Sequence, residues 1–112
     1  MTAVTLKSNR DFSRIYRSGK SYVSANLVTY VLKNRKNNLR VGITTSKKVG
    51  SAVQRNRCRR IIRAAFSAID AEPRAGYDIV FVARTRTAHI KSTDLLVCMR
   101  EHLKASGVIG KL

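Results

Sequence analysis

The first part of the chain carries a helical pattern of apolar residues. Residues 9–18 have apolar side chains at the spacing i, i+3 and i+4, which places them on one face of a helix. These are Phe12, Ile15 and Tyr16. Ser8 and Asp11 have the spacing of a capping box at the start of this helix, and Gly19 suits its end. The pattern therefore predicts a short N-terminal helix.

Two strand-like stretches follow, joined by a polar turn. The stretch 21–33 is rich in valine, tyrosine and threonine, which are typical of strands. In the stretch 39–45, apolar residues alternate with other residues, as in a half-buried strand. Between them, residues 34–38 contain three asparagines, which tolerate the left-handed conformation that turns require. We expect the two strands to pair as an antiparallel hairpin.

A longer helix is predicted over residues 51–69. Ser51 and Gln54 have the spacing of a second capping box. A continuous apolar stripe runs along one side of the helix, formed by Cys58, Ile61, Ile62, Ala65, Phe66 and Ile69. At about 100° per residue, the opposite side carries Asn56, Arg59, Arg60 and Arg63, with Arg57 at its border. The helix should therefore pack on a sheet and present arginines to solvent.

The last two elements are a strand and a helix. Pro73 and Gly76 break the chain before residues 77–83, a nearly all-apolar run that is typical of a central strand covered on both faces. Residues 93–105 form the last predicted helix, with apolar residues on one stripe. The order is αββαβα, which predicts an α+β sandwich with one mixed sheet. With 112 residues, the chain 1–112 is expected to form a single domain.

The charge of the chain points to a polyanionic partner. Lysine and arginine number 23 against six acids, a net charge of +17. Between Asp11 and Asp70 there are fourteen basic residues and no acid. Such a surface repels itself, and solubility alone needs a net charge of only about 2–8. No apolar run approaches the roughly 18 residues of a membrane span, and the N-terminus lacks a signal-peptide pattern. We therefore expect a cytoplasmic protein that does not bind membranes.

The residues that usually support catalysis are sparse. His89 and His102 are interpreted as surface or boundary residues, and no pair of histidines or acids has the spacing of a general acid and base or of a metal cluster. Cys58 and Cys98 match no zinc or redox motif and are interpreted as reduced, mostly buried thiols. The chain has neither a glycine-rich phosphate loop nor a serine nucleophile motif. Catalysis by the protein itself is not expected.

The segment around the long helix is the strongest functional signal. Lys47 and Lys48 precede a helix N-terminus, where free N–H groups and the dipole favour phosphate. The arginines that follow can bind phosphate in a bidentate manner and stack on bases. No glutamates are interspersed to pair with them, as a merely solvated charged face would have. Double-helical DNA is also a possible target, but the preceding element is a strand, so no helix-turn-helix is formed.

The same segment resembles the bacterial ribonuclease P protein subunit. The resemblance rests on residues 41–50 (VGITTSKKVG) and 52–66 (AVQRNRCRRIIRAAF), which include the RNR motif of that family at 55–57. It extends upstream to RDF at 10–12 with Tyr16, and downstream to DIVFVAR at 78–84. It covers most of the chain in the right order. It implies a ribosomal protein S5 domain 2-like fold with a left-handed βαβ crossover, which is rare in general.

The resemblance also implies a function and its residues. In that family a catalytic RNA removes the 5′ leader of precursor tRNA. Magnesium is bound mainly by the RNA, and the protein is expected to have no cofactor of its own. We expect one protein per RNA. The implied residues for binding the catalytic RNA are Lys47, Lys48, Arg55, Asn56, Arg57, Arg59, Arg60 and Arg63. The implied cleft for the single-stranded leader contains Phe12, Tyr16 and Tyr30.

Two other interpretations remain open at this point. The first is a structural protein of the ribosomal type that holds rRNA, which would leave tRNA processing unchanged. The second is a stand-alone nuclease, which would cleave RNA without an RNA cofactor and which the absence of an acid–base pair argues against. The three aromatic residues are also compatible with an ordinary core. Exposed aromatic rings, however, bind single strands with little sequence preference.

Overall fold

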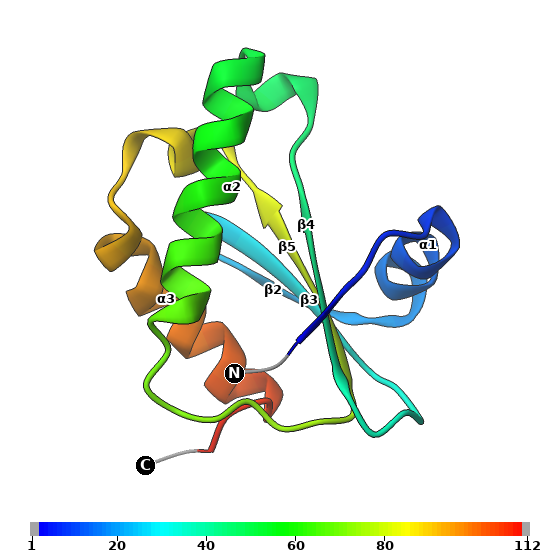
Figure 1. Ribbon diagram of the computed structural model, residues 1–112. Coiled ribbons are helices and arrows are strands. Elements are labelled where there is room, and N and C mark those ends of the chain that lie inside the picture. The colour runs from blue at the N-terminus through cyan, green and yellow to red at the C-terminus, as the bar shows by residue number, and fades with distance from the viewer. Residues whose placement is uncertain (1–2, 111–112) are drawn as a thin grey trace.

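The fold is built on one mixed sheet with helices on both faces (Figure 1). The computed structural model describes residues 3–110, and the strand order in the sheet is β1-β4-β5-β3-β2. The strands are β1 (Val4–Thr5), β2 (Lys20–Val23), β3 (Leu27–Lys33), β4 (Leu39–Thr44) and β5 (Tyr77–Ala83). The helices are α1 (Asn9–Ser18), α2 (Ala52–Ser67) and α3 (Ser92–Ser106), with short 3-10 helices η1 (Lys47–Val49) and η2 (Thr85–His89).

The α+β class and the order of the main elements are confirmed, with two refinements. A short strand, β1, precedes α1 and pairs in parallel with β4. The predicted strand 21–33 is divided into β2 and β3 by residues 24–26. Ser24 stabilises this break because its hydroxyl donates to the carbonyl of Leu27 (3.0 Å). The antiparallel hairpin of the fold is therefore β2–β3.

The predicted hairpin between 21–33 and 39–45 is wrong. β5 lies between these segments, antiparallel to β3 and parallel to β4. Val80, for example, lies opposite Tyr30 on one side and Gly42 on the other. The reason is that the most apolar strand is best buried in the middle of the sheet, where both of its faces are covered. The turn at 34–38 still joins β3 to β4, but across the end of β5.

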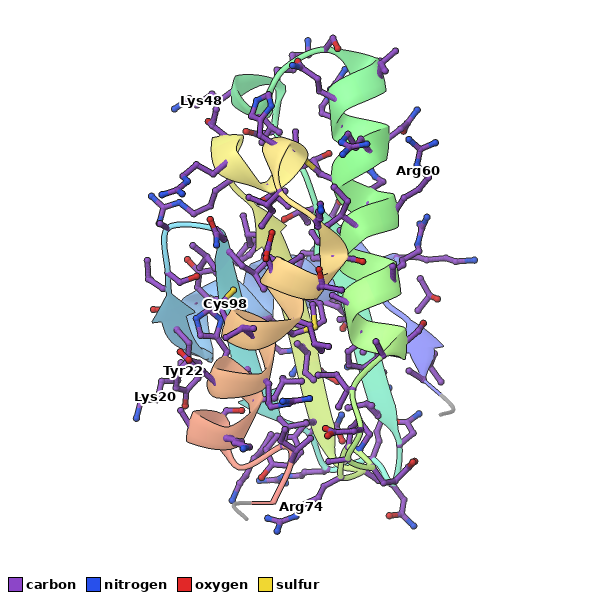
Figure 2. All side chains as sticks on the ribbon, turned by 90° about the vertical axis from the view of Figure 1, so that its left-hand side faces the viewer. Lys20, Tyr22, Lys48, Arg60, Arg74 and Cys98 are labelled. Atoms are coloured by element: carbon purple, nitrogen blue, oxygen red, sulfur yellow. The ribbon has the colours of Figure 1, made fainter. Side chains whose placement is uncertain are left out.

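The crossover from β4 through α2 to β5 is left-handed. The two strands are parallel neighbours, and α2 connects them. In Figure 2, where α2 lies in front of the sheet, β5 lies to the left of the upward-running β4. A right-handed connection would bring the second strand to the right. This confirms the crossover that the resemblance implied, against the general preference for right-handed units.

The two faces of the sheet carry separate cores. α2 and α3 cover one face and α1 covers the other (Figure 1). The larger core includes Leu27, Ile62, Phe81 and Met99, all with 0% exposure. The smaller core under α1 is centred on Ile15 and Val80. Because β5 alternates its side chains between the faces, it contributes to both cores.

The helix ends follow the predicted signals in part. The capping box of α2 is confirmed, since Gln54 N donates to Ser51 Oγ (3.3 Å) and Ser51 N donates to Gln54 Oε1 (2.9 Å). At α1 only Ser8 acts as a cap, because the Asp11 carboxylate instead accepts hydrogen bonds from arginines. Gly19 ends α1 as predicted. A Cβ there would lie 2.5 Å from the carbonyl oxygen of Ile15.

His102 differs from its sequence interpretation. The sequence places it at the surface or its boundary, but its side chain is on the buried side of α3, and its Nδ1 lies 2.8 Å from the hydroxyl of Thr29. The ring of Tyr22 packs beside it, with centroids 6.3 Å apart. Thr29 is fully buried in β3 and needs a polar partner, which the imidazole provides. His89 is exposed, as expected.

Candidate nucleic-acid interface

Three aromatic residues from two elements meet on the α1 face of the sheet. Phe12 and Tyr16 lie one helical turn apart on α1, with ring centroids 6.4 Å apart. The Tyr16 ring meets Tyr30 of β3 edge to face, with centroids 5.0 Å apart. Tyr16 is 40% exposed, and its hydroxyl lies 3.0 Å from that of Thr44. The structure therefore brings all three predicted aromatic residues together, with ring surface left open to solvent.

The close approach of Phe12 to the sheet depends on Gly42. A Cβ at Gly42 would lie 2.6 Å from Cε1 and 2.8 Å from Cζ of the Phe12 ring. Only a residue without a side chain leaves this space on β4. The glycine therefore sets how deeply the first turn of α1 packs, and with it the position of the aromatic cluster.

A buried carboxylate fixes α1 to the sheet. Asp78 of β5 is fully buried and accepts hydrogen bonds from Arg40 Nε (2.8 Å) and Nη2 (2.6 Å) and from Arg14 Nη2 (2.8 Å). Asn34 donates a further bond of 2.7 Å, and Asp11 pairs with both arginines. Burial by itself would raise the pKa of Asp78, but the hydrogen bonds from Arg40, Asn34 and Arg14 hold the pKa below its usual value.

Sequence reasoning missed this network. The available signal was a single aspartate near the start of an otherwise apolar strand, because a buried charge is retained only when it is paired. The arginines that satisfy it come from α1 and β4, which are distant in sequence. Arg14 and Arg40 hold α1 in place through these ion pairs, so their charges are already paired within the protein.

A groove continues from the aromatic cluster across the open part of the same face. Its volume is about 440 Å³. Apolar residues of β2, β3 and β5 form its floor, and the basic side chains of Lys48 and Arg84 line one side. Its lining includes Val23, Val28, Tyr30, Lys48, Val82 and Arg84. Arg84 is held by a hydrogen bond from its Nη1 to the carbonyl of Ser24 (2.9 Å). The groove therefore joins an aromatic surface to basic side chains.

The basic residues predicted for one surface are divided between two. Lys48 lines the groove on the α1 face together with Tyr30, whereas Arg60 projects from α2. Figure 2 shows these two side chains pointing to opposite sides of the molecule. Lys47 is exposed on η1, next to Lys48. The single basic segment of the sequence thus reaches both faces of the fold.

The arginines of α2 form a ridge that lies largely open to solvent. Asn56, Arg57, Arg60 and Arg63 are exposed, while Arg55 and Arg59 are half-buried. Among residues 3–110, the ion pairs involve only Arg14, Arg40 and Arg100 as cations. The α2 charges are therefore not neutralised within the described part of the chain. Arg57 has an additional structural role, because its Nε donates to the carbonyl of Ala88 (2.8 Å) and ties η2 to α2.

The residues that usually bind metals are scattered over the described part of the chain. No group of three or more His, Cys, Asp or Glu side chains comes together within residues 3–110. The best-placed carboxylates, Asp11 and Asp78, are already paired with arginines. Cys58 and Cys98 are free thiols, and burial raises the pKa of each. Over the same range, each helix is too short or too polar to cross a bilayer.

Comparison with known proteins gives a consistent match. The family model described as Ribonuclease P matches residues 1–106. The ribonuclease P protein component of Clostridioides difficile is 41% identical over 104 residues, which cover 92% of this chain and 91% of the relative. The solved structure of the Staphylococcus aureus RNase P protein is 33% identical with a TM-score of 0.83, covering 97% of this chain and 100% of the other. The solved structure of the Thermotoga maritima RNase P protein is 28% identical with a TM-score of 0.78. The match covers 90% of this chain and 96% of the other.

Proposed function

Because the chain belongs to the ribonuclease P protein family of bacteria, we propose that it binds the catalytic RNA of ribonuclease P through α2 and the 5′ leader of precursor tRNA through the α1 face. Family membership itself implies a role in tRNA processing within an endoribonuclease complex. The observation that carries the finer proposal is the meeting of Phe12, Tyr16 and Tyr30 beside a groove with basic residues.

The α1 face has the properties that a variable single strand requires. Each base can stack on an aromatic ring whatever its identity, at about 1–3 kcal/mol per base. The three rings provide such a surface, and Lys48 and Arg84 along the groove can contact the phosphates that follow. The leader therefore runs from the aromatic cluster toward η1. Lys48 belongs to this path as well as to the basic segment that the sequence indicated.

The α2 ridge suits a folded RNA. Arg57, Arg60 and Arg63 present guanidinium groups that can bind phosphates in a bidentate manner. Each phosphate contact releases condensed counterions, so the affinity should fall steeply as salt increases. With this ridge and the leader groove on opposite faces of one sheet, the protein bridges catalytic RNA and substrate.

The chemistry is assigned to the RNA. The carboxylates of this chain are few, and those that are buried are paired with arginines. Magnesium in the complex is accordingly held by RNA phosphates, and the protein contributes positive charge that lowers the magnesium requirement. One protein acts with one RNA. Nothing in the side chains described favours cleavage by the protein alone.

The decisive experiment is cleavage of a precursor tRNA with a 5′ leader at low magnesium. A bacterial ribonuclease P RNA is assayed with and without this protein. The expected result is cleavage at the mature 5′ end that requires both components. Absence of stimulation at every salt concentration would favour a ribosomal-type RNA-binding protein, and cleavage by the protein alone would indicate an undetected active site.

A further inference from the structure

The leader groove ends at the two short 3-10 helices. Lys48 of η1, Thr85 of η2 and Arg84, which precedes η2, all line it. Figure 2 shows η2, in yellow, beside η1, from which Lys48 projects. Val80 lies opposite Tyr30 in the sheet, and the four residues of extended chain from Val80 to Arg84 span about 13 Å. Arg84 therefore lies beyond the aromatic cluster, at the far end of the groove.

The hydroxyl of Thr87 ties η2 to the turn between β2 and β3. Thr87 is fully buried, so its side chain cannot contact RNA. Its Oγ1 accepts a hydrogen bond from the backbone N–H of Arg84 (2.9 Å) and donates one to the carbonyl of Asn26 (2.6 Å). Because one hydroxyl forms both bonds, it fixes the position of Arg84 relative to residues 24–26.

The side chain of Arg84 is bound to the same turn. Its Nη1 donates to the carbonyl of Ser24 (2.9 Å), so the backbone and the side chain of Arg84 are both attached to residues 24–26. A guanidinium has five N–H groups, and this bond leaves others for a ligand. Arg84 is exposed and takes part in none of the ion pairs within residues 3–110. The group is therefore held in place and can still bind a phosphate.

The opposite side of η2 is held as well. Arg57 of α2 donates from Nε to the carbonyl of Ala88 (2.8 Å), which fixes η2 between α2 and the groove. A cation that is already held loses less conformational freedom when a ligand binds, so its contact contributes more to affinity. Loss of the Thr87 hydroxyl would remove the link on the groove side and free Arg84 to move.

We propose that Thr87 is a positioning residue, which holds the Arg84 guanidinium in place for a phosphate of the leader beyond the nucleotides on the aromatic cluster. This inference rests on the proposed function and adds a residue that acts on the leader only through Arg84. Because the contact lies at the far end of the groove, it should matter only for leaders that are long enough to reach η2.

The first test measures the affinity of the reconstituted complex for precursor tRNAs whose leaders are shortened stepwise from the 5′ end. Thr87→Val removes the hydroxyl and keeps a side chain of similar shape. It should weaken binding of long leaders about fivefold, equivalent to about 1 kcal/mol, and leave short leaders and mature tRNA unaffected. Thr87→Ser, which keeps the hydroxyl, should restore the affinity.

The matched control is Thr29→Val. It also removes a fully buried hydroxyl, but one that lies beside His102 on the other face of the sheet. Its affinity for long leaders should equal that of the wild type. A loss in Thr87→Val that is the same at every leader length would overturn the proposal, because a general loss of stability does not depend on the leader.

The second test combines Thr87→Val with Arg84→Ala. If Thr87 acts through Arg84, the double variant should bind long leaders no more weakly than Arg84→Ala, because both changes remove the same contact. Fully additive losses would contradict the proposal. If Thr87→Val does not fold, Thr87→Ala removes the same hydroxyl with a smaller side chain and takes its place in both tests.

Two results separate the possible failures. If the wild-type complex does not bind precursor tRNA more tightly than mature tRNA, the proposed function fails first. If it does, but Thr87→Val matches the wild type at every leader length, the positioning role is refuted while the proposed function stands.

Discussion

The ring of Tyr16 on α1 meets the ring of Tyr30 on β3 edge to face, with centroids 5.0 Å apart and an interplanar angle of 75°. The two residues are separated along the chain by β2 and a turn, yet they share one solvent-accessible surface. Edge-to-face contacts of this kind stabilise aromatic pairs by about 0.5–1.5 kcal/mol. The contact therefore orders the rings while leaving ring surface available to a base.

Replacing Tyr30 should weaken the binding of precursor tRNA and leave mature tRNA unaffected. Tyr30→Leu retains an apolar side chain but removes a stacking surface that contributes about 1–3 kcal/mol per base. Dissociation constants of the complex for precursor and mature tRNA provide the measurement. Tyr22→Leu on the other face of the sheet is the matched control, since Tyr22 packs near His102. Equal losses for both tRNAs would remove the leader assignment.

Replacing Arg60 should weaken binding of the catalytic RNA and flatten its salt dependence. Arg60→Ala removes an exposed guanidinium from the α2 ridge. The slope of log K against log salt should decrease by about one for each lost phosphate contact. Filter binding over a range of salt concentrations measures it. Arg35→Ala, in the exposed turn after β3, changes the net charge equally, and an identical change of slope there would argue against a localised ridge.

Adding a methyl group at Gly42 should disturb the proposed leader site by displacing the Phe12 ring. The new Cβ of Gly42→Ala would lie 2.6 Å from the Phe12 ring, so the ring has to move. We expect weaker binding of precursor tRNA and unchanged affinity for the catalytic RNA. Gly110→Ala is the control, because the nearest atom to its Cβ is 3.8 Å away. Full precursor affinity in Gly42→Ala would show that Phe12 does not contribute to the site.

Neutralising Asp78 should destabilise the fold strongly. Asp78→Asn leaves Arg40 buried without its carboxylate, and breaking a buried pair costs about 3–5 kcal/mol. Urea unfolding measures this loss near neutral pH. Because the pKa of Asp78 is lowered from 3.8 in the folded state, its stabilisation is complete above that value and disappears as the pH falls through the folded-state pKa. The difference between wild type and Asp78→Asn should therefore shrink in acid, and a constant difference would contradict this assignment.

Protonation of His102 should destabilise the packing of α3. Burial lowers the pKa of His102, with the charge of Glu101 opposing the shift. The folded state thus favours the neutral ring, so stability is complete above the unfolded-state value of about 6.5 and decreases as the pH falls through the folded-state pKa. Denaturation midpoints at about pH 8 and pH 5 should differ less in His102→Gln than in the wild type. His89→Gln, at an exposed site, should behave like the wild type.

The elements that were predictable are those set by local pattern. The apolar face of α1, the capping box at Ser51 and the stripe of α2 depend on residues within one or two turns of each other. The excess of basic over acidic residues likewise needs no structure to be recognised. The RNR segment and the three aromatic residues were available from the sequence through resemblance, because their order and spacing are local properties.

Which elements lie against each other is a property of the tertiary structure. Local pattern predicts the three helices, most of the strands and a polyanionic partner, since periodicity indicates which side of an element is buried. It does not state what covers that side. Three relationships are visible only in the fold. β5 lies between β3 and β4, and Asp78 pairs with Arg40. Lys48 lines a groove with Tyr30 and lies apart from Arg60. These relationships depend on contacts between distant parts of the chain. The strand order must bury the apolar faces and pair the buried charges of all five strands together.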